Sequence, residues 1–181
     1  ALESEIAAQE KQTAVYKQLG LSEKTTPDLR FEEPGTYLYN TLGTDWLKTE
    51  IMISQRPWTL EEYPFMQKWL EENEDALNLL NEVSRKPYFY APVVKDEETS
   101  IFEETANEMD YHFHTFIRNY SRALHARANY HLGTGNIDAA IEDKLTIVRL
   151  GRYGGHGVGV VPGIIGIACE GIGVSIGIGS N

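Results

Sequence analysis

Apolar residues recur every three or four positions along most of this chain, a spacing that predicts helices. The longest such stretch begins at Ser100, which with Glu103 fits a capping box, and continues to Leu132. We expect one face of this helix to be buried, with Phe113 and Phe116 in the core. Its apolar positions are Phe102, Ala106, Met109, Phe113, Phe116, Ile117, Tyr120, Leu124 and Ala128.

A second helix is predicted over residues 137–150, directly after a short turn. Asn136 is a favourable N-cap residue. We expect Gly133 to end the first helix and Gly151 to stop the second. The inward-facing side chains are predicted to be those of Ile137, Ala140, Ile141, Leu145 and Val148. Two antiparallel helices joined by so short a turn form a helical hairpin.

A helix is also predicted ahead of the hairpin, ending before Pro87. Thr59 and Glu62 fit a capping box, but Pro64 would interrupt a helix that began there. Either the Thr59 turn stands apart, or the helix begins at Pro64.

The length of 181 residues suits one domain of ordinary size. We divide the chain into residues 1–58, with N-terminal helices at 2–19 and in part of 37–54, and residues 59–181, the helical-hairpin body. These two parts most simply form one continuous domain. The predicted fold class is therefore all-α, built from antiparallel helical hairpins and closed by a Gly-rich apolar C-terminal segment.

The apolar tail, residues 157–179, allows three interpretations. Its length suits a membrane span, its alternation of Ile or Val with Gly or Ser suits a strand, and it also suits a buried helix. Glu170 would lie near mid-depth in a bilayer, at a cost of roughly 2.5–3.5 kcal/mol. We therefore favour a helix over 162–170 docked on 137–150, so that membrane contact is possible but not favoured. The docking side chains are predicted to be those of Ile164, Ile165 and Ile167.

The charge of the chain narrows the possible partners. There are 27 acidic and 16 basic residues, a net charge of −11, and the first 110 residues hold 23 of the acidic and 10 of the basic ones. A nucleic-acid binder normally presents a basic surface to phosphates, so we expect no nucleic-acid partner. The acidic half is either a solvated surface or one that meets a basic partner. The single cysteine, Cys169, excludes an internal disulfide and a thiolate zinc site.

Few residue patterns indicate catalysis. Glu104, Glu108 and His112 line one face of the predicted long helix, which suits a metal site or, more simply, a solvated surface. Cys169 lies in an apolar run, where an inert buried thiol is the ordinary outcome. We expect no catalytic residue, no bound metal and no cofactor.

Four residues are candidates for contact with a protein partner. Arg118 and Arg122 share a face of the long helix, which suits either balance of the acidic surface or a site for an anion or carboxylate peptide. Tyr88 and Tyr90 lie in an extended segment between two prolines and are expected to pack on a surface.

Residues 124–150 resemble one tetratricopeptide-type unit. The small and apolar positions at which the two helices of such a hairpin touch are occupied by Leu124, Ala128, Gly135 and Ala140. Lys144 and Ile147 depart from the pattern, because they stand where a large aromatic residue and an alanine are expected.

A second resemblance rests on segments spread over about residues 60–170. They are Glu62-Tyr63-Pro64, Trp69-Leu70, Asn73-Glu74, Arg85-Lys86-Pro87 with Tyr90 and Pro92, Arg127-Ala128, Leu132-Gly133-x-Gly135, Ala139-Ala140, Arg149-Leu150-Gly151-Arg152 and Ile165-Gly166-Ile167-Ala168. In these the chain resembles a family of uncharacterised helical proteins from planctomycete bacteria. The resemblance implies an all-α body of stacked hairpins in an exported or envelope-associated protein, and it implies no known activity. The Gly-Ile repeat at 171–179 departs from the family pattern.

Together these observations favour a non-catalytic helical scaffold or protein-binding module with a protein partner. One alternative is a metal-dependent enzyme with its carboxylate and histidine site on the long helix. Another is a subunit of a larger envelope or membrane complex that makes contact through residues 157–179. We expect an exported or envelope location rather than a cytoplasmic one.

Overall fold

A computed structural model of the chain describes residues 30–87, 109–155 and 160–174. The helices are α2 (Pro34–Leu42), α3 (Trp46–Gln55), α4 (Met66–Ser84), α6 (Met109–Gly133), α7 (Ile137–Gly155) and α8 (Val160–Val174), with a 3-10 turn, Gly43–Asp45, between α2 and α3. The all-α prediction is confirmed, with helices packed antiparallel, whereas no tetratricopeptide repeat is shown. The helix predicted over 2–19 lies outside the described residues.

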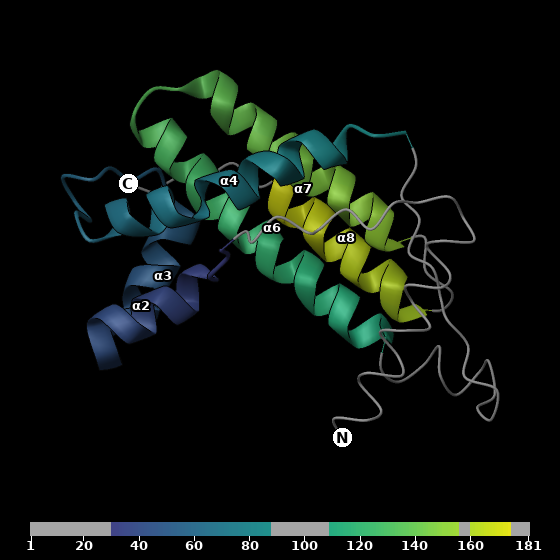
Figure 1. Ribbon diagram of the computed structural model, residues 1–181, viewed down its shortest axis with the longest axis horizontal. Helices are drawn as coiled ribbons and strands as arrows, with labels where there is room; N and C mark the ends of the chain where they lie inside the picture. Colours follow the sequence, from purple (N-terminus) through teal and green to yellow (C-terminus); the bar gives the residue numbers. More distant parts are fainter. Residues whose placement is uncertain (1–29, 88–108, 156–159, 175–181) are drawn as a thin grey trace.

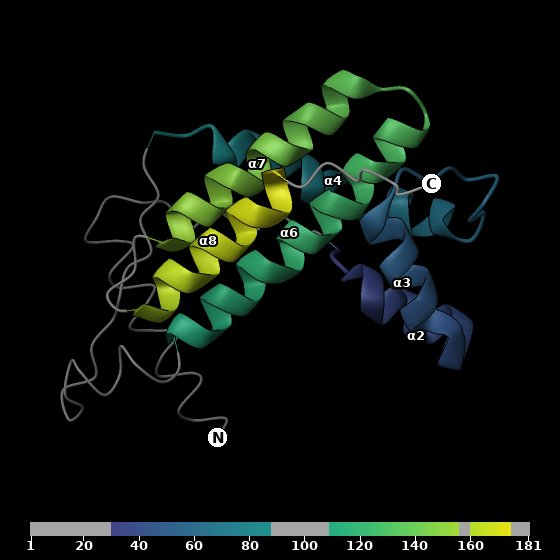
Figure 2. The same cartoon turned by 180° about the vertical axis from the view of Figure 1, so that it is seen from behind.

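The body of the molecule is formed by α6, α7 and α8, which pack side by side. In Figures 1 and 2, α8 lies alongside both α6 and α7, while α4 crosses the α6–α7 pair and α2 and α3 lie near one end. The predicted hairpin is thus confirmed as the centre of the fold, with α4 on one side of it and α8 on another.

The turn of the hairpin is fixed by backbone hydrogen bonds. The Asn136 N–H donates to the His131 carbonyl at 2.8 Å, and the Gly135 N–H donates to the Leu132 carbonyl at 3.2 Å. This is a Schellman motif, and its left-handed residue is Gly135, with a φ of 78°. The Asn136 side chain caps α7 as predicted, since its Oδ1 accepts the Ala139 N–H at 3.4 Å.

Gly133 has a role that the sequence did not reveal. A Cβ atom at this position would lie 2.0 Å from the carbonyl oxygen of Trp58. Only glycine therefore lets the segment between α3 and α4 approach α6 this closely. Trp58 itself is fully buried, and its Nε1–H donates to the Ala126 carbonyl at 3.0 Å.

The end of α3 is held to α6 by side chains. The last carbonyls of a helix lack partners within it, and here the Asn129 Nδ2 donates to the carbonyls of Ile53 at 2.9 Å and Ser54 at 3.1 Å. His125 lies within 2.7 Å of the Ser54 carbonyl through its Nε2. These contacts, together with Trp58, form what we call the α3–α6 latch.

The buried face of α6 differs from the predicted one. Phe116 is 44% exposed and its ring packs at a tilt of 55° against that of Tyr120, so its assignment to the core was wrong. The side chain of Phe113 lies outside the described part. The buried row is instead formed by Ile117, Ser121, Leu124 and Ala128.

The predicted inward face of α7 is also largely wrong. Three of its members, Ile137, Ile141 and Leu145, are exposed, whereas Ala140 is buried as predicted. The row that faces the core consists of Ala140, Asp143, Ile147 and Leu150. Gly151 does not stop the helix, which continues to Gly155.

The described part of the tail is helical and docks on α7, as predicted for residues 162–170. The contact uses glycines, because a Cβ at Gly151 would lie 2.9 Å from the Gly166 carbonyl oxygen. Ile167 is 73% exposed, so its predicted docking role was wrong, and the side chains of Ile164 and Ile165 lie outside the described part. Among the described helices, none has the length and apolar character that crossing a membrane requires.

Two alternatives were predicted for the chain before α4, a separate turn at Thr59 or a helix that begins at Pro64. The structure shows the first. Glu62 accepts the Thr59 N–H at 3.3 Å, which is one half of the predicted capping box. The residues up to Phe65 form turns, and α4 begins at Met66, two residues after Pro64. The Thr59 turn therefore stands apart from the helix.

Candidate functional site

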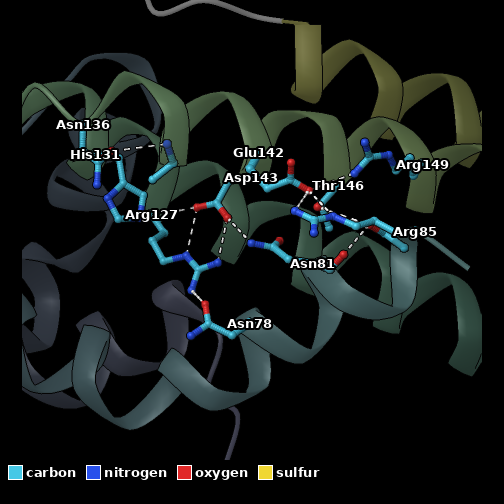
Figure 3. Close-up of polar contacts among 12 residues, drawn as sticks. Asn78, Asn81, Arg85, Arg127, His131, Asn136, Glu142, Asp143, Thr146 and Arg149 are labelled. Carbon is cyan, nitrogen blue, oxygen red and sulfur yellow. Dashed lines mark hydrogen bonds and ion pairs between the residues drawn. The ribbon is translucent and has the colours of Figure 1, made fainter.

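A buried ion pair joins the two helices of the hairpin. Arg127 of α6 donates from Nε to Asp143 Oδ2 at 2.9 Å and from Nη2 to Asp143 Oδ1 at 2.7 Å. The side chains are only 7% and 1% exposed, respectively. Figure 3 shows the two groups pointing toward each other in this bidentate geometry, which is the strong form of the arginine–carboxylate contact.

Two asparagines of α4 complete this network. Arg127 donates from Nη1 to Asn78 Oδ1 at 2.9 Å, and Asn81 donates from Nδ2 to Asp143 Oδ1 at 3.1 Å (Figure 3). The network therefore ties α4 to both α6 and α7. Asn81 Oδ1 is buried and has no hydrogen-bond partner among the described residues.

A second set of polar contacts, which we call the second polar layer, also joins α4 to α7. Glu142 accepts hydrogen bonds from Arg85 Nε and Arg149 Nη1, both at 3.0 Å. Burial alone would raise the pKa of the Glu142 carboxyl, but the hydrogen bonds and charges of these two arginines together lower it. Ser84 and Thr146 lie 3.3 Å apart, buried between the same helices. α4 is thus held against the hairpin by polar groups as well as by the apolar core, to which its Leu77 and Leu80 belong.

A cleft of about 540 Å³ opens beside this network, between α4 and the hairpin. Its lining consists of Leu60, Gln67, Leu70, Glu71, Glu74, Asn78, Asn81, Arg127, Tyr130, His131, Ala139, Glu142 and Asp143. Four of these residues are carboxylates and one is an arginine. Burial lowers the pKa of His131, so its ring adds no positive charge at neutral pH. The cleft, which we call the acidic cleft, therefore combines an apolar wall with an excess of negative charge.

A smaller pocket, of about 320 Å³, lies where α3, α6 and α8 meet. His125 lines it and has Lys144 Nζ 2.6 Å from its Nδ1. Because lysine can only donate, Nδ1 is the acceptor, and Nε2 must carry the proton that is donated to the Ser54 carbonyl. Burial and the neighbouring Lys144 lower the pKa of His125 to about 4, and burial lowers that of Lys144 to about 8.

The His125 arrangement is explained by its structural role. Both ring nitrogens are already engaged, one by Lys144 and one by the end of α3. Neither is positioned to take a proton from a substrate without breaking a contact that holds α3 in place. We therefore take the acidic cleft as the candidate functional site.

Most of the side chains predicted from the sequence to form a site lie outside the described part of the chain. Glu104, Glu108, Tyr88 and Tyr90 are outside the described residues, as is the side chain of His112. Within the described residues, no group of three or more histidine, cysteine or acidic residues could hold a metal ion.

The two predicted arginines do not reach the acidic cleft. Arg118 is exposed on α6. Arg122 donates to Glu33 at 3.1 Å and lines the smaller pocket. The structure therefore places the predicted cationic face and the acidic cleft in different parts of the surface.

The network of Arg127, Asp143, Asn78 and Asn81 was missed by sequence reasoning. One signal was available: Asp143 shares the helical spacing of Ala140, Ile147 and Leu150. A charged residue on an otherwise apolar stripe requires a buried partner of opposite charge. Searching for that partner would have directed attention to Arg127.

Comparison with models of protein families, with curated proteins and with solved structures finds no match to this chain.

Proposed function

We propose that this protein is a non-catalytic protein-binding module and that the acidic cleft receives a segment of its partner. The observation that carries the proposal is the cleft itself, which is open to solvent on a surface where α4, α6 and α7 meet. Its volume is in the range of sites that bind small ligands or side chains.

The rigidity of the cleft supports a binding role. Arg127 and Asp143 are saturated by each other and by the two asparagines, and Glu142 is held by two arginines. Side chains held in this way lose little conformational freedom when a partner arrives, which favours affinity. The same saturation leaves these groups poorly suited to act as a nucleophile or general base.

Two further parts of the proposal rest on resemblance. We assign the hairpin to the tetratricopeptide-like kind because of Leu124, Ala128, Gly135 and Ala140, and we assign the chain to an exported or envelope-associated protein because of its resemblance to planctomycete proteins. Both assignments suit a scaffold that binds other proteins.

The test is a selection of peptides from a random library on the whole chain, followed by binding to two variants. Ala139→Trp fills the cleft, since Ala139 lines it and is half-buried. Ala168→Trp adds the same side chain at an exposed position of α8 and serves as the control. We expect selected peptides to bind at least tenfold more weakly to Ala139→Trp and with unchanged affinity to Ala168→Trp. Equal affinities for both variants would contradict the assignment of the cleft.

A further inference from the structure

We infer that the acidic cleft recognises a basic side chain, an arginine or a lysine in an extended segment of the partner; this inference rests on the proposed function. Charge is the first reason. Glu71 and Glu74 line the cleft and are exposed, and neither forms an ion pair with any described residue. Glu71 Oε1 accepts a hydrogen bond from Gln67 Nε2 at 2.9 Å, a neutral contact that leaves the negative charge uncompensated. Their negative charges are therefore available to a ligand.

The positive charge in the cleft is not available to an anion. Among the described lining residues, Arg127 is the one arginine or lysine, and its Nε and both Nη atoms already donate to Asp143 and Asn78. Glu142 is neutralised by arginines that lie outside the lining. An anionic ligand would thus meet Glu71 and Glu74 with no cation left to compensate, whereas a cation would form charge-assisted hydrogen bonds.

The rest of the lining suits the shape of a basic side chain. Arginine and lysine carry an apolar stem below their charged end, and Leu60, Leu70 and Tyr130 supply apolar surface for such a stem. Asn81 also lines the cleft, and its Oδ1, an acceptor, is buried without a partner among the described residues, so the polarity of this wall favours a donor over an anion. A carboxylate or phosphate ligand offers no such donor.

The cleft also offers a hydrogen-bond donor to the peptide backbone of the partner. The Arg127 guanidinium occupies Asn78 Oδ1, which orients the Asn78 amide and leaves its Nδ2 as a donor at an exposed position of the cleft. A carbonyl of an extended segment is the complementary acceptor. We therefore expect a partner segment with a basic residue beside a backbone stretch that is free of secondary structure.

The experiment uses two small probes that differ in charge but hardly in shape. N-acetyl-arginine amide and N-acetyl-citrulline amide are titrated into the isotope-labelled whole chain, and backbone amide shifts are followed by NMR. We expect the arginine probe to shift signals of residues 71, 74 and 78 and the citrulline probe to shift them at least fivefold less. Equal shifts with both probes would overturn the inference.

Matched variants separate a local effect from a general one. Glu71→Gln and Glu74→Gln together remove the two available charges, while Asp75→Asn changes an exposed carboxylate of the same helix that does not line the cleft. We expect the double variant to bind the arginine probe at least fivefold more weakly and Asp75→Asn less than twofold more weakly. An effect of Asp75→Asn as large as that of the double variant would show that only the net charge matters, which also contradicts the inference.

The failure of this inference is distinguishable from failure of the proposed function. Peptides that lose binding to Ala139→Trp but carry no basic residue would leave the binding module in place and overturn the basic specificity. The opposite result is also possible: the arginine probe shifts signals in the cleft, but no selected peptide loses binding to Ala139→Trp. That result would keep the basic site and overturn the peptide-binding role.

Discussion

The two sides of α7 are built in opposite ways. Toward α4 and α6 the contacts are made by side chains that reach across, above all Asp143 with Arg127 and Thr146 with Ser84. Toward α8 the contact is made where side chains are missing, at Gly151 and Gly173. A Cβ at Gly173 would lie 2.8 Å from Val148 Cγ2 and 3.0 Å from the Lys144 carbonyl oxygen, so the lack of a side chain at Gly173 lets α8 lie close to α7.

The difference explains where the candidate site lies. Polar side chains that bridge helices fix the spacing between them and leave space beside the bridge, whereas a glycine contact closes that space. The acidic cleft accordingly opens on the polar side of α7. The stability of a polar interface also depends on pH and on the presence of both partners. The stability of a glycine interface depends instead on the volume of the side chains placed there. The following experiments test this contrast.

The largest effect is expected for Asp143→Ala, which leaves Arg127 buried without its partner. Breaking one half of such a pair typically costs about 3–5 kcal/mol of the free energy of unfolding. The double variant Arg127→Met/Asp143→Leu removes both charges and should recover most of that loss. Urea denaturation of the three proteins measures the difference, and a double variant no more stable than Asp143→Ala would show that the charge imbalance is not the cause.

The next effect concerns pH. The pKa of His125 falls from 6.5 to about 4 on folding. As the pH falls, the unfolded state therefore takes up this proton first, and stability is lost between pH 6.5 and pH 4, by up to about 3 kcal/mol. Urea denaturation at pH 7.5 and pH 4 gives the change for the wild type and for His125→Gln, which cannot titrate. A variant with the same loss as the wild type would exclude His125 as the source.

A smaller effect is expected on the glycine side. Gly151→Ala adds a Cβ 2.9 Å from the Gly166 carbonyl oxygen, and overpacking of this kind costs about 1–3 kcal/mol. Gly171→Ala is the matched control, since nothing lies within 4 Å of its added Cβ, and alanine in a helix gains about 0.5–1 kcal/mol over glycine. Thermal melts should therefore shift in opposite directions. Shifts in the same direction would mean that helix propensity outweighs the close contact.

The smallest effect is expected for Glu142→Gln. The carboxylate is partly exposed, and ion pairs of this kind contribute about 0–1 kcal/mol. Urea denaturation should show a loss well below that of Asp143→Ala, although Glu142 and Asp143 are adjacent on α7 and both pair with arginine. A loss as large as that of Asp143→Ala would show that burial does not decide how much each carboxylate contributes to stability.

The parts of the fold that depend on residues close together in the sequence could be predicted from it. The hairpin turn is specified by Asn136 and Gly135, whose effects operate within a few positions of the chain. Helical spacing likewise predicted most of the helices. It did not decide which of two adjacent stripes faces the core, and Phe116 was assigned to the core when its neighbour Ile117 is buried there.

The site could not be predicted in the same way. Asp143 is buried only because Arg127, from another helix, neutralises it, and Asn78 and Asn81 come from a third helix. Such a partnership is a property of packing, not of local pattern. The close approach of Gly151 of α7 to Gly166 of α8 is likewise a contact between two helices, which the local pattern of neither helix specifies.

The α3–α6 latch also bears on how the protein folds and how long it lasts. Its contacts join residues far apart in the chain, 68 positions between Trp58 and Ala126 and 76 between Ile53 and Asn129. The α6–α7 hairpin, by contrast, closes through a short turn. Closing a long loop costs more conformational entropy, so we expect the hairpin to form early and the latch late. Contacts formed after the transition state slow unfolding without speeding folding. We therefore expect the latch to lengthen the lifetime of the native protein by slowing its unfolding.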